Sequence, residues 1–466
     1  MRNKSFAVLL MLLSLALAPL QAEENEERTI RYLLRTPTTA QAQAVCERYN
    51  LQLVGNAGHP DVFLVQAPDA LSPDVLKQWV KDDSDVQNLE VERHANVVET
   101  SPVPGPYIPS LPVTHHVTDG NLTKLYGTTA WAGYVQQPAV NLTHAGSAIR
   151  HNLIGTGTVV AVIDTGVDAG NPILAPVLVS GFDFTRNAAG VASDLADIDP
   201  ATAAALQQRT VGVLDPYSVV QLNAYSSAFL EQRTVAVLDP YNLPSLLGHG
   251  TMVAGLIHLV APGAQIMPLK AFRADGSSTL SNIVQAIYYA TDNGANVINM
   301  SFAMKEVSDE LVRAINYANR SGVICVASTG NDGQRTFVYP AGLYGVIGVA
   351  SVSQDNSASS FTNYGKDLVT VATVGEGLVT TYFGSHYAVV WGTSFSSALV
   401  AGAVADLLTA SDSYTRHQLM FNDVQRALAN GNASCSPDGV LGAGCLNLFQ
   451  ATHYIHDIRI PARHHY

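Results

Sequence analysis

Three short segments of the sequence each set a residue that can take part in acid–base or nucleophilic chemistry among small or apolar neighbours. Asp164 ends the apolar run Val159–Ile163, His249 stands between two glycines, and Ser394 begins an apolar stretch that continues to Gly402. A serine hydroxyl is a weak nucleophile that needs an adjacent base. A histidine can be that base, and a carboxylate can hold its imidazole in the required tautomer. The three residue types therefore point to acyl transfer through a serine.

Each residue also stands where an α/β fold would need it. A carboxylate at the carboxyl end of a buried parallel strand lies where open α/β sheets place their sites. The glycines Gly248 and Gly250 let a helix pack closely just after His249. Ser394 opens a helix, whose N-terminus offers backbone N–H groups and the positive end of a dipole.

From about residue 128 onward, short β-branched runs alternate with longer helical segments. We expect strands over Thr158–Ile163, Gln265–Ala271, Val297–Met300, Val323–Ala327 and Val346–Ala350, with helices over Leu280–Asn293 and Ser308–Asn319. Apolar runs separated by helices indicate an α/β fold with a mostly parallel sheet covered on both faces.

Residues 28–95 predict a separate small α+β unit. Strands are expected at Thr29–Leu34, Leu51–Val54, Asp61–Ala67 and Asp85–Glu92, and helices start at Thr36-Pro37 and Ser72-Pro73. This β-α-β-β-α-β order is the split, ferredoxin-like plan. The proline-rich residues 96–127 that follow are typical of an exposed linker.

The N-terminus has the pattern of an export signal. Arg2 and Lys4 precede the apolar residues 5–18, and Leu20-Gln21-Ala22 ends on a small residue, so we expect a signal peptide over residues 1–22. The protein should be secreted, extracellular or periplasmic, with no retained membrane helix.

Export also permits disulfides. Cys435 and Cys445 flank a glycine-containing loop and are the best candidate pair, whereas Cys325 is interpreted as an inert core thiol.

The order of the three segments resembles that of the subtilisin-like serine proteases, over about residues 128–452. The segments are Val159-Val160-Ala161-Val162-Ile163-Asp164-Thr165-Gly166, Gly248-His249-Gly250-Thr251 and Gly392-Thr393-Ser394. Residues 28–95 resemble that family's inhibitor-like pro-region. The resemblance implies a three-layer α/β/α fold and a secreted endopeptidase that acts through Asp164, His249 and Ser394 and an acyl-enzyme.

The resemblance assigns further residues. Asn331, in Ala327-Ser328-Thr329-Gly330-Asn331-Asp332-Gly333, would donate its amide to the oxyanion beside the backbone N–H of Ser394. The segment Ser301, Phe302 and Ala303 would bind the substrate backbone and wall the first specificity pocket, with Tyr339–Gly342 as the opposite lip. The chain departs from the family at Ala303, where glycine is usual, and at Ala398, where many members have proline.

Residues 187–246 form an insertion longer than the family usually carries. It holds a duplicated segment, residues 208–217 and 232–241, offset by 24 residues. We interpret it as a surface excursion, with a lid over the substrate cleft as the alternative.

The insertion makes any transfer of calcium ligands from that region unsafe, so whether the protein binds a structural calcium stays open. The chemistry itself requires no cofactor, and no metal site is assigned.

Composition limits the partners. The net charge of −13 provides no basic footprint for nucleic acid, and 47% apolar with 14% charged residues is typical of a globular chain. We expect a monomer that binds peptide or protein substrates and its own pro-region, with no membrane contact after signal removal and a C-terminal tail over residues 453–466. Two alternatives stay open: a non-catalytic scaffold of the same fold, and a protease dedicated to one precursor.

Overall fold

The structure is a computed structural model. It describes residues 29–68, 72–97, 121–190, 192–208, 219–220, 244, 246–410, 421–430, 435 and 439–457. The predicted signal peptide, most of the linker and nearly all of both duplicated segments lie outside the described residues.

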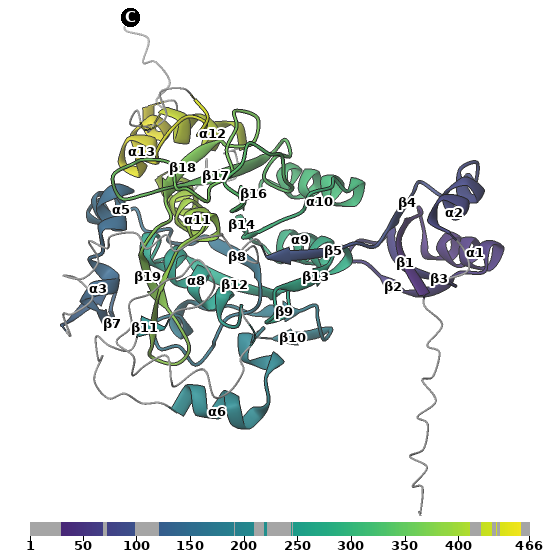
Figure 1. The fold of residues 1–466 in the computed structure, drawn as a ribbon, viewed down its shortest axis with the longest axis horizontal. Helices are drawn as coiled ribbons and strands as arrows, with labels where there is room; N and C mark the ends of the chain where they lie inside the picture. Colours follow the sequence, from purple (N-terminus) through teal and green to yellow (C-terminus); the bar gives the residue numbers. More distant parts are fainter. Residues whose placement is uncertain are drawn as a thin grey trace, which may run out of the picture.

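The N-terminal unit has the predicted split plan (Figure 1, purple). Its elements are β1 (Thr29–Arg35), α1 (Thr39–Tyr49), β2 (Gln52–Asn56), β3 (Val62–Pro68), α2 (Pro73–Val80) and β4 (Asn88–Val91). The strands form a sheet in the order β2-β3-β1-β4, and Tyr32, Val45, Phe63 and Leu76 fill its core. The start of α1 differs from the expectation: Thr38, not Thr36, caps the helix, because its hydroxyl accepts from the Gln41 N–H.

A further strand, β5 (His94–Val97), follows β4 and was not expected. It pairs antiparallel with β13 (Ser277–Thr279) on one side and β15 (Phe302–Ala303) on the other. The boundary expected at residue 95 therefore falls inside a strand that joins the N-terminal unit to the larger domain. The local sequence does not predict this strand, because the strands that pair with it lie far along the chain.

The larger domain is built on an eight-stranded sheet in the order β10-β9-β12-β8-β14-β16-β17-β18. Its strands are β8 (Val159–Asp164), β9 (Gly181–Asp183), β10 (Ala188–Gly190), β12 (Gln265–Lys270), β14 (Val297–Met300), β16 (Ile324–Ser328), β17 (Val346–Val352) and β18 (Val371–Val374). All pairs are parallel except β9 with β10. The strands expected from β-branched runs are present, whereas β9, β10 and β18 are short and were missed.

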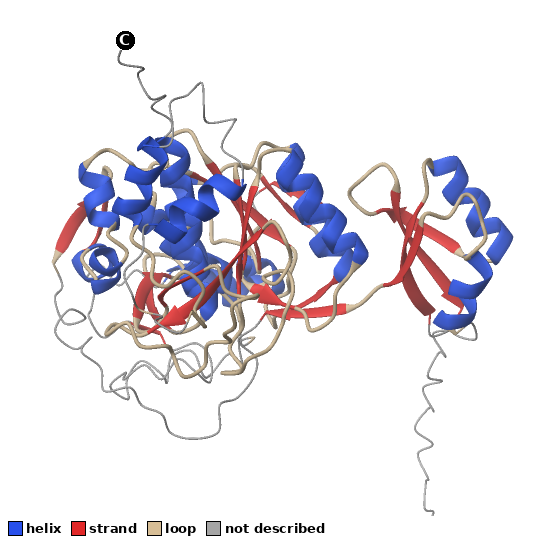
Figure 2. Ribbon diagram, turned by 90° about the horizontal axis from the view of Figure 1, so that it is seen from above, coloured by secondary structure: helices blue, strands red, loops and turns tan. Residues whose placement is uncertain are grey.

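Helices cover both faces of this sheet (Figure 2). Val160 and Val162 of β8 share a core with α8 (His249–Val260) and α11 (Thr393–Ala410), while Ala161 and Ile163 share one with α9 (Leu280–Asp292) and α10 (Asp309–Arg320). Successive residues of one strand thus enter opposite cores, as alternation along a strand requires. The expected three-layer α/β/α class is confirmed. By length and composition α11 is apolar enough to cross a membrane, but 89% of its most apolar window is buried, as in the core helix of a soluble protein.

Smaller elements complete the domain. They are β6 (Leu122–Leu125), β7 (Thr128–Trp131), α3 (Ala132–Val135), α4 (Pro138–Leu142), α5 (Ala145–Arg150), the 3₁₀ turns η3 (Ala175–Val177) and η4 (Asp194–Asp197), α6 (Pro200–Gln208), β11 (Val219–Val220), β19 (Leu378–Thr381), β20 (Tyr387–Val390), α12 (Phe421–Asn430) and α13 (Leu448–Asp457). Two expected boundaries lie inside elements: residue 128 begins the second strand of the β6–β7 hairpin, and α13 continues past residue 452.

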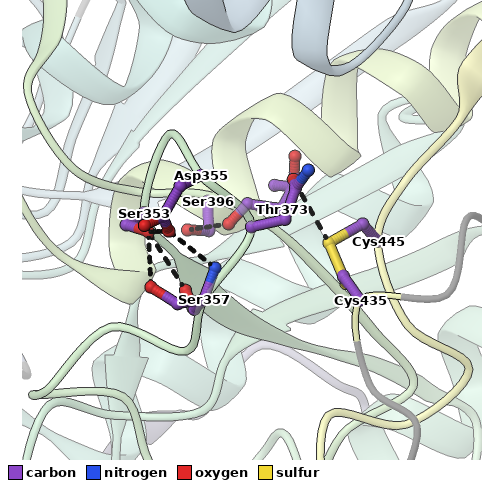
Figure 3. The surroundings of a disulfide bond; sticks show 8 residues. Ser353, Asp355, Ser357, Thr373, Ser396, Cys435 and Cys445 are labelled. Atoms are coloured by element: carbon purple, nitrogen blue, oxygen red, sulfur yellow. Dashed lines mark hydrogen bonds between the residues drawn. A yellow bond between two sulfur atoms is a disulfide. The ribbon is translucent and has the colours of Figure 1, made fainter.

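The expected disulfide between Cys435 and Cys445 is present and is confirmed. It lies near a turn in which Asp355 accepts from the hydroxyl of Ser353 and the N–H of Ser357 (Figure 3). Cys325 is buried and free, and burial raises the pKa of its thiol to about 12, which agrees with an inert core residue.

The N-terminal unit is docked through a buried ion pair. Arg35, 7% exposed, donates to Glu310 at the start of α10 at 2.6 Å, to Asp61 and to the Tyr288 hydroxyl. Glu90 of β4 accepts from the hydroxyl of Ser308, the cap residue of α10, at 2.9 Å. Removing one partner would leave the other charge buried and unpaired, which typically costs about 3–5 kcal/mol, so the docking on α9 and α10 requires both partners.

The described part of residues 187–246 is not wholly a surface excursion. Leu195 and Asp194 of η4 are buried, and β10 extends the main sheet. The expected insertion therefore contains residues that belong to the core of the domain.

Gly402 sets how closely α11 can approach α8. A Cβ atom at this position would lie 2.9 Å from the Val260 Cβ and 3.0 Å from the Ile257 carbonyl oxygen. We expect Gly402→Val to overpack this contact and to lower the free energy of unfolding by about 1–3 kcal/mol. Thermal unfolding followed by circular dichroism checks this.

Gly55→Ala is the control for Gly402→Val, because a Cβ there meets nothing within 4 Å. An unchanged Tm for Gly402→Val would show that the two helices do not depend on this close approach.

Candidate active site

Asp164 and His249 meet at the carboxyl edge of the sheet. Asp164 is the last residue of β8 and His249 the first of α8, and the His249 Nδ1 lies 2.7 Å from the Asp164 Oδ1. The Asp164 carboxylate also accepts from the Thr165 N–H at 2.7 Å. Both side chains are at most 1% exposed. A buried carboxylate at this atom stabilises the imidazole tautomer that carries its proton on Nδ1.

Two glycines explain how the strand end and the helix start come together. A Cβ on Gly250 would lie 2.0 Å from the Gly166 carbonyl oxygen, and Gly166 itself has a φ of +109°. A larger residue at position 250 would push α8 away from the end of β8, and one at position 166 would clash with the backbone of residues 192–194. The small residues beside Asp164 and His249 are thus required by the backbone contact.

Ser394 is the second residue of α11 and is fully buried. Its Oγ donates to the Ser301 carbonyl at 3.4 Å, and the Ser301 Oγ donates to the Ser394 carbonyl at 3.1 Å. The ring of the next residue, Phe395, lies 5.4 Å from the His249 ring, centroid to centroid. The start of α11 is therefore held between the Ser301 segment and the imidazole.

Asn331 lies in the loop after β16, beside the start of α11. Its Oδ1 accepts from the Thr393 N–H at 2.9 Å and from the Thr393 Oγ1 at 2.8 Å. A backbone N–H can only donate, so this contact identifies the oxygen of the amide and leaves Nδ2 as the donor group of the side chain. Residue types alone did not single out Thr393 as the anchor of this amide.

Ser301, Phe302 and Ala303 lie together next to Ser394. Phe302 is fully buried against Phe272, at a ring centroid distance of 5.0 Å, while the backbone of Phe302 and Ala303 pairs with β5. Met304 and Tyr339 exchange backbone hydrogen bonds of 2.7 and 2.8 Å, so the expected lip adjoins this segment. The β15 edge can accept an extended peptide strand.

Beneath the Asp164–His249 pair lies a buried polar layer that sequence reasoning missed. Lys270, fully buried on β12, donates to the Thr165 carbonyl at 2.6 Å and to Asp197 at 2.6 Å, and Asp194 contacts Thr165 and Thr251. The sequence signal that could have indicated this polar layer was a lysine at the end of an apolar strand. Among the described residues no group of three or more His, Cys, Asp or Glu side chains is gathered as a metal site would require.

The arrangement unites the parts that acyl transfer needs. A serine at a helix N-terminus lies near an imidazole that a carboxylate orients, and an anchored amide donor stands beside it. Such a set can activate a hydroxyl and stabilise a developing oxyanion.

Comparisons with known proteins agree with this geometry. The sequence model of the subtilase family matches residues 155–444. Thermitase of Thermoactinomyces vulgaris is 30% identical over 301 residues, which cover 64% of this chain and 90% of thermitase. Subtilisin BL of Lederbergia lenta is 35% identical over 214 residues, 44% of this chain and 77% of that protein.

Other relatives are matched over part of their length. A thermostable alkaline protease of Halalkalibacterium halodurans is 34% identical over 206 residues, 42% of this chain, and the match spans 57% of that protein.

Among solved structures, fervidolysin of Fervidobacterium pennivorans, a keratinolytic enzyme related to subtilisin, superposes with a TM-score of 0.63 at 20% identity. The match covers 92% of this chain and 62% of fervidolysin, and it supports the fold. Because the family model covers more than half of this chain and thermitase is matched over nearly all of its length, the chain belongs to the subtilase family.

Proposed function

We propose that this protein is a secreted serine endopeptidase, made as a precursor whose N-terminal unit is removed. The observation that carries the proposal is the buried 2.7 Å contact between His249 Nδ1 and Asp164 Oδ1, with Ser394 at the adjacent helix start. The peptidases among its relatives support the same activity.

The proposed reaction follows from these positions. The Ser394 Oγ leaves its long contact with the Ser301 carbonyl and attacks the scissile carbonyl carbon, while the His249 Nε2 takes the hydroxyl proton. The tetrahedral oxyanion accepts from the Asn331 Nδ2 and the Ser394 N–H. His249 then gives the proton to the leaving amine, the C–N bond breaks, and water hydrolyses the acyl-enzyme by the same steps.

Substrates are proposed to bind as an added strand. The edges of β13 and β15 already pair with one extended segment, β5, in the unprocessed chain. A peptide in the same position would satisfy both edges through its backbone, which favours extended, unfolded segments over folded protein.

The N-terminal unit is the proposed internal inhibitor. In β5, Asn96 is opposite Ala303 and Val97 is opposite Phe302, so the antiparallel register leads toward Ser301, whose carbonyl contacts the Ser394 Oγ. The bond that is cut should therefore be one of the first four after Val97, so the mature chain should begin within residues 98–101.

Replacing Ser394 or His249 by alanine tests the triad. Each variant should lower peptidase kcat by several orders of magnitude, and the double variant should be little worse than either, because the residues act as one unit. Initial rates on a peptide library, with fluorophosphonate labelling of wild type and Ser394→Ala, measure this.

Losses that multiply in the double variant would contradict the shared mechanism. If wild type is not labelled and has no turnover, the non-catalytic scaffold is favoured.

Asn331→Ala tests the oxyanion donor. We expect kcat to fall by about 10²–10³ with a much smaller change in KM, because the donor acts mainly on charge that develops in the transition state. Steady-state kinetics on one peptide substrate separate the two constants. Asn293→Ala, at the C-terminal end of α9, is the control and should behave as wild type. A raised KM with unchanged kcat would make Asn331 a binding or loop residue.

Ser394→Ala also tests self-processing. This variant should accumulate as a precursor that lacks only the signal peptide, whereas wild type should yield a chain that starts within residues 98–101. Intact mass spectrometry after expression in a host without other secreted proteases measures both. Trimming of the inactive variant at the same place and rate would rule out self-processing, and a fully active, untrimmed wild type would remove the pro-region assignment.

A further inference from the structure

Asp194 is a fully buried carboxylate that none of the proposed catalytic steps uses. It lies in η4, before the part of the insertion that holds the duplicated segments. Its Oδ1 accepts from the Thr165 Oγ1 at 2.5 Å, and its Oδ2 accepts from the Thr251 Oγ1 at 2.6 Å and the Thr251 N–H at 3.1 Å. All three donors come from the two segments that carry Asp164 and His249.

These contacts supply the cap that α8 lacks. Its N-cap residue, Gly248, has no side chain, so the first N–H groups of the helix need other acceptors. The Gly250 N–H donates to the Thr165 Oγ1 at 3.0 Å, and the Thr251 N–H donates to Asp194. A negative charge at this helix end is also favoured by the helix dipole. Asp194 therefore joins the end of β8 to the helix start that carries His249.

We propose that Asp194 is a positioning residue that sets the distance and orientation of the Asp164–His249 pair. It contacts no substrate and acts through Thr165, which follows Asp164, and Thr251, two residues after His249. The inference rests on the proposed peptidase function for its kinetic consequence. A misplacement of about 1 Å in such a pair can reduce the rate about 100-fold.

The charge of Asp194 matters for the same contacts. Burial raises the pKa of its carboxyl to about 7, with the Lys270 ammonium opposing and the Asp164 carboxylate adding to the rise. The groups that face it are Lys270 of β12, Asp164 of β8, and Tyr382, whose own pKa is raised by burial and by Asp194. Above about pH 7 the ionised carboxylate accepts all three hydrogen bonds, whereas the protonated acid must donate one. The positioning effect should therefore weaken as the pH falls through about 7.

The test compares processed wild type with Asp194→Asn, which keeps the shape but loses an acceptor and cannot ionise. Active sites are counted by stoichiometric fluorophosphonate labelling. We expect kcat to fall about 10- to 100-fold with KM within about twofold of wild type. The acid limb of kcat/KM should become less steep, because the ionisation of residue 194 no longer contributes to it. Asp183→Asn, at a buried carboxylate that holds the turn after β9, is the matched control and should keep wild-type kcat.

A second readout does not depend on turnover. The Nδ1 proton of His249 in ¹⁵N-labelled protein should shift in Asp194→Asn and stay in place in Asp183→Asn. If wild type has no turnover but this shift occurs, the proposed function fails and the positioning role stands. Wild-type kcat and an unmoved resonance in Asp194→Asn, with only a lower Tm, would overturn the inference.

If Asp194→Asn does not fold, Thr165→Val and Thr251→Val each remove one hydroxyl donor to the same carboxylate. Each should lower kcat at least about fivefold, and the double variant should cost less than the product of the two, since both act on one contact. Wild-type kcat in both single variants would overturn the inference.

Discussion

The close packing of α8 against α11 is the contact on which the rest of the site depends. Both helices begin at the carboxyl edge of the parallel sheet, so His249 and Ser394 can meet only if the two axes stay close. A Cβ atom on Gly402 would force α11 away from α8, and a Cβ atom on Gly250 would force α8 away from the end of β8. The small residues in these segments are therefore as necessary to the site as its titratable groups.

A second layer of polar residues connects these elements beneath the site. Lys270, Asp197, Asp194 and the two threonines bring buried charges together with complementary donors and acceptors, which is how a low-dielectric interior tolerates them. Lys270 in particular donates to the Thr165 and Phe272 carbonyls as well as to Asp197. This layer ties the start of η4, the end of β8, the end of β12 and the first turn of α8 into one unit.

The N-terminal unit shares more than a linker with the larger domain. Leu33, Val62 and Ala95 pack in the same apolar cluster as Ile283 and Leu311 of α9 and α10, and the Arg35–Glu310 pair is buried within this contact. In addition, β5 supplies backbone partners to β13 and β15, whose edges would otherwise be unpaired there. The same docking can thus support the fold of the precursor and, in the proposed function, keep substrates from the site until the chain is cut.

Local patterns in the sequence were sufficient to predict most of the secondary structure and the fold class. The β-branched runs predicted the parallel sheet and its covering helices, and local patterns placed Asp164 at a strand end and Ser394 at a helix start. That these two residues form one site with His249 was implied by the resemblance to the subtilisin-like proteases. The order of strands and helices in residues 28–95 predicted the split plan. These features could be read because each depends on periodicity, turn residues or spacing within one short segment.

The remaining features of the fold and the site depend on contacts between segments that lie far apart in the sequence. The strand β5 exists because edges about 180 to 200 residues later pair with it, and its four residues carry no strand pattern of their own. Asp194 lies in η4, a segment that resembles no motif, and only folding brings its carboxylate to Thr165 and Thr251. Thr393 anchors Asn331 for the same reason. Hydrogen bonds between distant loops depend on which backbone groups are left without partners after the sheet and helices form, and no short stretch of sequence carries that information.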